Sequence, residues 1–490
     1  MRNVNFLCLS ISQIQNKLKD KSITSLKLVN LCFDKIGIYD KNLGAFLNLN
    51  KENALIEAEA SDIRRNNGKL LGSLDGIPIA IKDMILTKDL QTTAASKILK
   101  GFIPPYDATV IEKLKKNGAI ILGKLNQDEF AMGSSNERSA YRSCHNPWNL
   151  KKSPGGSSGG SAVAVAASFC FASLGTDTGG SIRQPAAFCG VVGLKPTYGR
   201  VSRFGVIAYA SSLDQVGPLT RDVKSSALML EVISGYDEHD STSSDKDVPS
   251  YSSLLDKDIS GLKVGIPKEY FISDLNSSVM LSTKNAIDAL KKRGAIIVNI
   301  SLPHTKYAIS AYYIISSSEA SSNLARYDGI RFGPRVVDYD NLEDLYSKTR
   351  GTFFGSEVKR RIMLGTYVLS AGYYDDYYLK AQKVRRLISL DFNEAFKLVD
   401  VILTPTTPTS AFKIGEKIND PLKMYLNDIF TIGVNLSGLP SISLNTGFCE
   451  KNMPIGTQII GKYFDEELIL RTAYNIEKEL KLNSFPKLEI

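Results

Sequence analysis

The stretch SPGGSSGGSAVAVAASFCFASLGTDTGGSIRQPAAFCGVVG, residues 153–193, decides the fold of this 490-residue chain. Two glycine-serine clusters, Gly155–Ser161 and Gly175–Ser181, flank small and β-branched residues that can pack tightly against a sheet. Glycine lets backbone amides turn inward without a side chain in the way, and serine places a hydroxyl beside them. We expect a helix over 159–167, a strand over 172–175 and a short helix over 181–188. The pattern predicts a segment that binds or attacks an electrophile.

Strands and helices alternate on both sides of this stretch. The apolar run Ile77–Lys82 is typical of a strand, and a helical pattern over Asp107–Asn117 leads to a second strand over Ala119–Leu125. The remaining expected elements are strands at 262–266, 295–300, 399–403 and 441–445, a helix at 277–293 and a mostly helical region at 307–396. Strand-helix-strand order favours parallel pairing. We predict an α/β fold in which a mixed, largely parallel β-sheet is covered by helices on both faces.

The chain is predicted to form one large domain over residues 1–490. Its length exceeds the usual domain size, but no Pro/Ser/Gly-rich linker or low-complexity run divides it. Ser10 and Gln13 match a capping box, and further helices are expected at 25–36 and 51–66. These helices within residues 1–66 are expected to be outer decoration or a docking surface for a partner. A core over 72–230 and the helical insertion over 307–396 complete this organisation.

Composition and charge narrow the class of protein. A composition of 43% hydrophobic and 23% charged residues is that of a globular protein. The net charge of +9 leaves an anionic partner such as nucleic acid open, although the lysines are spread along the chain as on an ordinary solvated surface. The six cysteines are scattered with no C-x-x-C pair, which favours reduced thiols over disulfides or a zinc site.

The amino terminus shows no signal-peptide pattern. The longest apolar-leaning stretch, Ser161–Leu174, is shorter than the ~20 residues that a membrane-spanning helix needs. We therefore expect a cytoplasmic protein without a membrane partner, and we expect no metal site.

A histidine-assisted serine is one candidate for the chemistry. Gly155-x-Ser157-x-Gly159 matches the G-x-S-x-G turn of α/β-hydrolases, whose catalytic histidine follows the serine in the chain. Of the three histidines, His145 precedes the serines, His239 lies in a charged loop, and none follows His304. This distribution argues against a histidine triad.

A phosphate-binding loop is a second candidate. The glycine spacing from Gly155 to Gly160 fits the loop, but the next residue is Ser161. The nucleotide-binding loop requires Lys followed by Ser or Thr at this point, to reach the phosphates and the magnesium ion. The spacing alone therefore does not predict nucleotide binding.

A serine can also be activated by a lysine, provided that burial and neighbouring groups lower the pKa of the amine enough to leave it neutral. Lys82 ends an apolar strand and has that setting. Here the chain resembles the amidase signature family, whose members combine a GIPIAIKD strand, a GGSSGGS loop and a DTGGSIRQPA segment. All three motifs are present, at residues 76–83, 155–161 and 177–186.

The resemblance assigns a role to each motif. It makes Ser181 the nucleophile that forms an acyl ester, Ser157 a bridging hydroxyl after a cis peptide bond from Gly156, and Lys82 the terminal base. Ser158 is expected to hydrogen-bond within its loop.

An oxyanion hole is expected at the backbone amides of Thr178, Gly179 and Gly180, together with that of Ser181. Unpaired N–H groups near the start of a helix favour negative charge, so this segment can stabilise an oxyanion.

The resemblance extends to the glutamine-hydrolysing subunits of tRNA-dependent amidotransferases. It is carried by SSNE at 134–137, VGLKPTYGRVSR at 192–203, KRRIMLGT at 359–366, SAGYYD at 370–375, MYLND at 424–428 and NLSGLP at 435–440. It implies hydrolysis of glutamine through a γ-glutamyl ester of Ser181. The ammonia then passes to a partner that has activated the glutamate of Glu-tRNA(Gln). The implied partners are the B and C subunits of a heterotrimer. No cofactor is expected in this chain, and ATP and Mg²⁺ are expected on the partner subunit.

Glutamine carries an α-carboxylate and an α-ammonium, so its pocket should offer one cation and one anion. By resemblance, Arg361 pairs with the carboxylate and Asp428 with the ammonium, through charge-assisted hydrogen bonds. Tyr312 is a further pocket candidate, which places part of the substrate pocket on the 307–396 insertion.

Two alternatives remain open at this point. A stand-alone amidase for aryl, fatty or peptide amides would keep the same three motifs without needing Arg361 or Asp428. A scaffold subunit with an inactive site would be expected to have lost Lys82, Ser157 or Ser181, and all three are present.

Overall fold

The computed structural model describes residues 5–271, 275–482 and 484–488. Within them, the strands form one eleven-stranded sheet in the order β1-β3-β2-β4-β6-β5-β10-β11-β9-β7-β8. The strands are β1 (Phe46–Leu49), β2 (Pro78–Lys82), β3 (Ile120–Leu125), β4 (Ala172–Asp177), β5 (Val192–Lys195), β6 (Gln215–Thr220), β7 (Lys263–Pro267), β8 (Ile296–Ile300), β9 (Val401–Pro405), β10 (Ser441–Phe448) and β11 (Pro454–Ile460).

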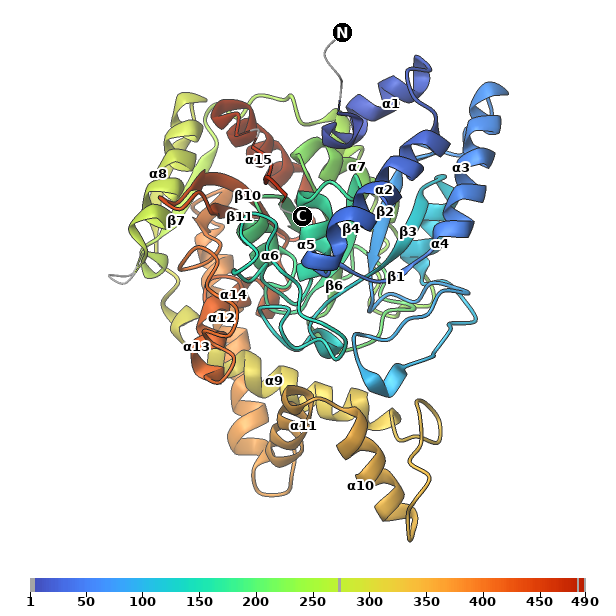
Figure 1. Cartoon of the computed structure of the whole chain (residues 1–490). Coiled ribbons are helices and arrows are strands. Elements are labelled where there is room, and N and C mark those ends of the chain that lie inside the picture. Colours follow the sequence, from blue (N-terminus) through green and yellow to red (C-terminus); the bar gives the residue numbers. More distant parts are fainter. Residues whose placement is uncertain (1–4, 272–274, 483, 489–490) are drawn as a thin grey trace.

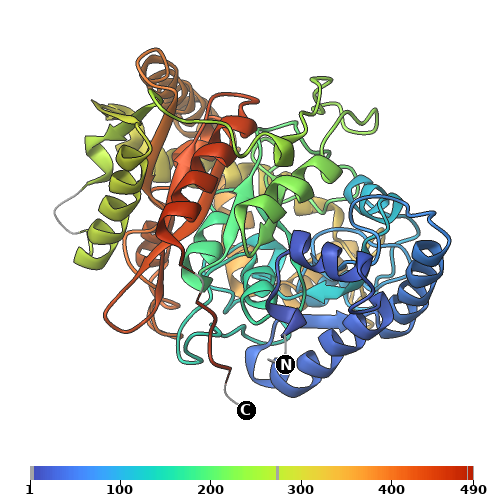
Figure 2. The same ribbon diagram turned by 90° about the horizontal axis from the view of Figure 1, so that it is seen from above.

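Helices flank the sheet, as Figures 1 and 2 show. They are α1 (Ile11–Lys19), α2 (Ser25–Leu43), α3 (Lys51–Asn66), α4 (Thr109–Lys116), α5 (Gly159–Ala166), α6 (Arg183–Cys189), α7 (Val223–Ile233), α8 (Ser277–Lys292), α9 (Ala308–Asn323), α10 (Leu342–Phe353), α11 (Ser356–Val368), α12 (Lys380–Ala395), α13 (Pro421–Tyr425), α14 (Ile432–Leu436) and α15 (Glu466–Leu480). The α/β class predicted from the alternation of elements is confirmed.

The sheet is mixed, but its parallel share is smaller than predicted. Four strand pairs are parallel, β2-β3, β2-β4, β7-β8 and β7-β9, and six are antiparallel. The strand pattern is too weak to predict β1, β5, β6 and β11, and β6 contains both Gly217 and Pro218. The pairs β5-β6 and β10-β11 are each joined by a segment without an α-helix, which suffices for antiparallel pairing, whereas a parallel pair needs a crossover.

The amino-terminal helices begin where the sequence predicts. Ser10 and Gln13 form the capping box at the start of α1, and Thr24 caps α2 through the backbone amide of Lys27. In Figure 1 these helices lie at the opposite end of the molecule from α9, α10 and α11, which extend below the sheet. The insertion predicted to be mostly helical is therefore set apart from the amino terminus.

The middle of the sheet is buried on both faces. Every residue of β2, β3, β4 and β6 is buried, and so is every residue of α5. The helix consists of Gly, Ser, Ala and Val, and these small side chains let its backbone approach the neighbouring chain closely. A Cβ atom at Gly160 would lie 2.7 Å from the carbonyl oxygen of Ala45 and would also meet the carbonyl of Asn126. The glycine-serine loop before α5 is held in place by this packing.

Gly160→Ala is expected to destabilise the protein by about 1–3 kcal/mol, because the added methyl group overpacks the contact with Ala45 and Asn126. Gly37 in α2 has nothing within 4 Å of its Cβ position. Gly37→Ala is therefore the control and should be neutral or stabilising by up to about 1 kcal/mol through helix propensity. Urea unfolding of both variants measures the difference, and equal effects would contradict the packing of α5 described above.

Candidate active site

The Lys82 amine lies at the carboxyl end of β2, between β3 and β4. Its Nζ donates hydrogen bonds to Ser157 Oγ at 2.7 Å, Ser158 Oγ at 2.8 Å and Thr176 Oγ1 at 2.8 Å. Because β2 and β4 are parallel neighbours, Thr176 reaches the amine from the adjacent strand. The loop and the two strands thus converge on one nitrogen.

This amine is fully buried, with 0% of Lys82 exposed. Burial lowers the pKa of the Lys82 amine to about 7, although the carboxylates of Asp128, Asp177 and Asp214 act in the opposite direction. The amine can therefore exist in its neutral form near neutral pH, and a neutral amine can accept a proton.

The two serines of the predicted triad come from the two glycine-serine clusters. The peptide bond from Gly156 to Ser157 is cis. The backbone amide of Ser158 donates to the carbonyl of Ser181 at 3.1 Å, which joins the clusters. Ser157 is 0% exposed, whereas Ser181 is 8% exposed. Of the three residues Lys82, Ser157 and Ser181, only Ser181 can be reached from outside.

A buried ion pair shapes the loop before Ser181. Arg183 Nε donates to Asp177 Oδ2 at 3.1 Å, and both side chains are 0% exposed. Burial alone would raise the pKa of the Asp177 carboxyl, but Arg183 lowers it to about 2. This carboxylate also accepts from the amide of Gly180 at 2.8 Å. The Gly180 amide, expected to be an oxyanion donor, is therefore already bonded.

The amides of Thr178, Gly179 and Ser181 have no acceptor among the described residues. The Thr178 hydroxyl is not available as an oxyanion donor, since its Oγ1 donates to Asp214 Oδ1 at 2.7 Å. Tyr312 packs directly on the loop, because a Cβ atom at Gly179 would lie 2.7 Å from its Cζ. Tyr312 thus lines the space next to the free amides.

Arg361 lies on α11 inside a cage of tyrosines. Its guanidinium carbon is 5.5, 5.2 and 5.7 Å from the ring centroids of Tyr209, Tyr313 and Tyr425. Tyr313 in turn makes an edge contact with Tyr312, at a centroid distance of 5.0 Å. Arg361 is therefore connected to the loop of Gly179 through two adjacent tyrosines.

Asp428 is connected to the same loop through Thr431. The Thr431 hydroxyl lies 2.6 Å from the carbonyl oxygen of Gly179 and 3.0 Å from that of Asp428. Ser134 Oγ donates to Asp428 Oδ2, whereas Asp428 Oδ1 is buried with no partner among the described residues. Burial raises the pKa of the Asp428 carboxyl to about 7. An unsatisfied carboxylate oxygen of this kind can accept from a cationic ligand.

Several residues of the site escaped the sequence analysis. Ser158 was expected only to hydrogen-bond within its loop, yet it contacts the Lys82 amine. Thr176, Asp177 and Ser134 were given no role, although Asp177 lies within a recognised motif. Thr176 lies one residue beyond the predicted strand 172–175, and its place beside Lys82 follows from the pairing of β4 with β2, which the local pattern of residues does not indicate.

The three histidines take no part in this arrangement. Their Nδ1 atoms contact the carbonyl of Leu150 and the carboxylates of Asp237 and Asp391. The six cysteines are free. Among the described residues there is no cluster of three or more His, Cys, Asp or Glu side chains that could hold a metal ion. Nor does any described helix combine the length and apolar character needed to cross a bilayer.

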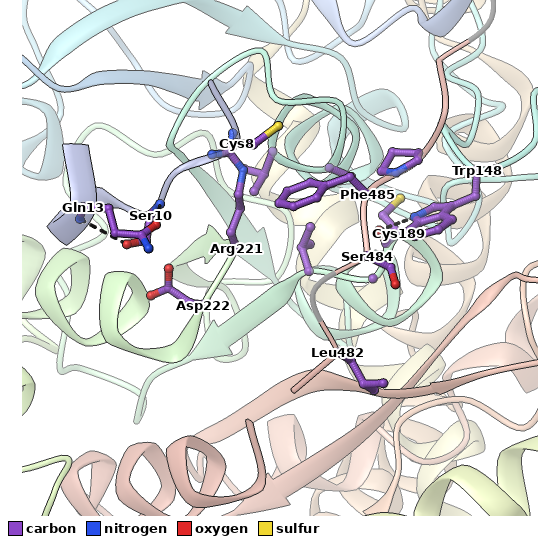
Figure 3. Close-up of a pocket in the computed structure, with 15 residues that line it drawn as sticks. Cys8, Ser10, Gln13, Trp148, Cys189, Arg221, Asp222, Leu482, Ser484 and Phe485 are labelled. Atoms are coloured by element: carbon purple, nitrogen blue, oxygen red, sulfur yellow. Dashed lines mark hydrogen bonds between the residues drawn. The ribbon is translucent and has the colours of Figure 1, made fainter. Parts of the chain in front are cut away.

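A separate pocket of about 130 Å³ lies elsewhere, between the amino-terminal segment and residues 484–486 (Figure 3). Arg221, Asp222 and Trp148 are among the residues that line it, and no predicted site residue does. We therefore assign the candidate active site to the surroundings of Ser181.

Comparison with known proteins agrees with this geometry. The family model described as Amidase matches residues 27–470. The A subunit of glutamyl-tRNA(Gln) amidotransferase from Geobacter sp. (strain M21) is 56% identical over 471 residues, which are 96% of this chain and 97% of the relative. The protein of the same name from Coxiella burnetii (strain Dugway 5J108-111) is 55% identical over 470 residues, which are 96% of this chain and 97% of that protein.

Solved structures show the same fold. The crystal structure of the glutamyl-tRNA(Gln) amidotransferase A subunit from Thermotoga maritima has a TM-score of 0.83 at 43% identity, with all of both chains covered. The native peptide amidase from Stenotrophomonas maltophilia has a TM-score of 0.81 at 29% identity, covering 98% of this chain and 99% of its own. On the match to the family model and to these relatives, the chain belongs to the amidase family.

Proposed function

We propose that this chain is the glutamine-hydrolysing subunit of a glutamyl-tRNA(Gln) amidotransferase. The observation that carries the proposal is the pairing of Arg361 and the unsatisfied Asp428 with the serines and Lys82. A cation and an anion that are both connected to the loop of the nucleophile suit a zwitterionic amino acid whose side chain ends in an amide. A site for simple aryl or fatty amides has no use for either charge.

In the proposed mechanism, Ser181 Oγ attacks the side-chain amide carbon of glutamine. Its proton passes to Ser157, whose own proton passes to the neutral amine of Lys82. The amides of Thr178, Gly179 and Ser181 are the proposed oxyanion donors; Gly180 shares this role only if its bond to Asp177 loosens. Ser157 then gives one proton to the departing nitrogen and regains one from Lys82, so ammonia leaves and a γ-glutamyl ester of Ser181 remains. Water then cleaves this ester to release glutamate.

The ammonia is proposed to pass to a B subunit that holds ATP and Mg²⁺ and converts Glu-tRNA(Gln) to Gln-tRNA(Gln), in a heterotrimer with a C subunit. The relatives named as A subunits of this amidotransferase support the assignment. The proposal includes a cytoplasmic location, where a tRNA-dependent reaction would take place. Because Tyr312 and Arg361 lie on α9 and α11, the 307–396 insertion forms part of the substrate pocket in this proposal.

The proposal is tested by glutamine-dependent ammonia release from the purified chain, alone and with candidate B and C subunits, ATP and Glu-tRNA(Gln). Release should rise when the partners are added. Ser181→Ala should lower it to below about a thousandth, because the residue forms the acyl ester. Turnover of aryl or fatty amides with no activity on glutamine would instead identify a stand-alone amidase.

Lys82→Ala should lower kcat by about 10²–10⁴-fold and change KM for glutamine little, because the amine acts in proton transfer. The pKa of this amine is about 7, so the neutral form is lost as pH falls below that value. The kcat/KM of the wild-type protein should therefore decrease from pH 8 to pH 6. A Lys82→Ala variant with a raised KM and an unchanged kcat would contradict the role of base.

Asp428 should make glutamine binding depend on pH. Its pKa is about 7, so the carboxylate that attracts the α-ammonium is present above pH 7 and is protonated below it. KM for glutamine is expected to be about tenfold higher at pH 6 than at pH 8. In Asp428→Asn, KM should be raised at pH 8 and should change little between the two pH values. A variant that keeps the wild-type dependence of KM would assign the titration to another group.

A further inference from the structure

A buried ion pair on α11 joins Arg361, the residue proposed to bind the α-carboxylate of glutamine, to Glu357. Glu357 and Arg361 are one helical turn apart, and Arg361 Nε donates to Glu357 Oε1 at 2.9 Å. Both side chains are 5% exposed. An i,i+4 pair of opposite charge is usual on a helix surface, but here it is turned inward. Such a pair fixes geometry, because neither charge can be left unpaired in the interior without a large cost.

The guanidinium of Arg361 is only partly used by the protein. Nε donates to Glu357 and Nη1 donates to the hydroxyl of Tyr209. Among the described residues, Nη2 has no acceptor, and it is not among the polar atoms sealed from solvent. A guanidinium presents its donors in a fixed planar fork, so holding two nitrogens determines where the third one points. One edge is thus left for a ligand.

Glu357 is itself firmly held. Tyr425 Oη donates to its Oε1 at 3.2 Å, and Arg360 bonds its Oε2. Burial raises the pKa of the Glu357 carboxyl, but the charge and hydrogen bond of Arg361 more than offset this, and the pKa is lowered overall. The residue is therefore a carboxylate at neutral pH.

The helix that carries both residues is fixed at two points. At its start, the amide of Gly355 donates to Glu129 Oε2 at 2.9 Å. Farther along, Gly365 lies against α9, where an added Cβ atom would be 2.6 Å from the carbonyl carbon of Ser317. Since the backbone of α11 is held in this way, the position of the Arg361 fork depends on its side-chain partners.

We propose that Glu357 is a positioning residue that aims the free edge of Arg361 at the substrate, and so restricts this site to amides that also carry a carboxylate. This inference rests on the proposed function, because it assumes that Arg361 binds the α-carboxylate of glutamine. Attraction alone predicts the opposite effect on KM, since Glu357 reduces the net positive charge that the α-carboxylate of glutamine meets. Removal of Glu357 raises KM for glutamine if Glu357 positions Arg361, and lowers KM if only the net charge matters.

Glutaminase kinetics of Glu357→Ala distinguish positioning of Arg361 from a simple effect of net charge. Positioning predicts that KM for glutamine rises by about tenfold or more while kcat stays within about twofold, because orientation is lost but the serines and Lys82 are untouched. Glu357→Gln keeps an oxygen that can accept from Nε, and its KM should lie between those of the wild type and Glu357→Ala. A KM that falls or does not change in Glu357→Ala would overturn the proposal.

Inhibition by two analogues of glutamine distinguishes positioning of Arg361 by Glu357 from a purely structural role of Glu357. Glutaramate keeps the carboxylate and lacks the ammonium, whereas 4-aminobutanamide keeps the ammonium and lacks the carboxylate. In Glu357→Ala, inhibition by glutaramate should weaken by about the same factor as KM rises, and inhibition by 4-aminobutanamide should not change. Equal weakening of both inhibitors would show that the pocket as a whole is disturbed, and would overturn the proposal.

Glu394→Gln is the matched control, because Glu394 is an exposed carboxylate on α12 that pairs with Lys397. Its kinetics should equal those of the wild type. Failure of this inference is distinguishable from failure of the proposed function. A wild-type protein that releases no ammonia from glutamine contradicts the function, whereas an active wild type with an unaltered Glu357→Ala variant contradicts the positioning role alone.

Discussion

The burial of one amine, that of Lys82, is the constraint on which the rest of the structure depends. A lysine charge in a protein interior is costly, and the cost falls when the amine loses its proton or finds several acceptors. The chain does both. It supplies three hydroxyl groups within 2.8 Å, from Ser157, Ser158 and Thr176, and it lowers the pKa to about 7. These acceptors come from β4 and from the loop before α5, so the close packing of glycines in α5 is a condition for the electrostatics of the site.

The buried ion pair of Asp177 and Arg183 fixes the second loop of the site, the one before Ser181. Asp177 holds the amide of Gly180, and Arg183 also reaches the Asn435 side chain and the Gln458 side chain at 3.0 Å. Through this pair, the loop before Ser181 is tied to segments that lie about 250 residues later in the chain. A fully buried ion pair contributes little net stability but is strongly destabilising when broken, so it serves to fix one arrangement of the loop.

In the proposed function, the helical insertion supplies the substrate recognition that the sheet lacks. The central strands and their loops can attack an amide, but they carry no group that distinguishes one amide from another. In the proposed function, Tyr312 and Arg361 on α9 and α11 make this distinction together with Asp428. Arg361 is paired with Glu357 inside a tyrosine cage, whereas Asp428 Oδ1 has no partner among the described residues. Relatives with the same fold and different names, such as the peptide amidase, are consistent with a shared core and variable surroundings.

The sequence by itself determined the local elements and the reacting groups. Capping residues and apolar periodicity placed α1, α3 and most strands within a few residues, and the three motifs named Lys82, Ser157 and Ser181, because these signals depend on neighbours in the chain. Tertiary structure alone decided the antiparallel strands β1, β5, β6 and β11, the use of the Gly180 amide by Asp177, and the contacts of Ser158 and Thr176 with Lys82. It also decided that Arg361 is shared between Glu357 and Tyr209. Strand partners and the acceptors of buried donors are chosen among residues far apart in the chain, so the local pattern of residues does not encode them.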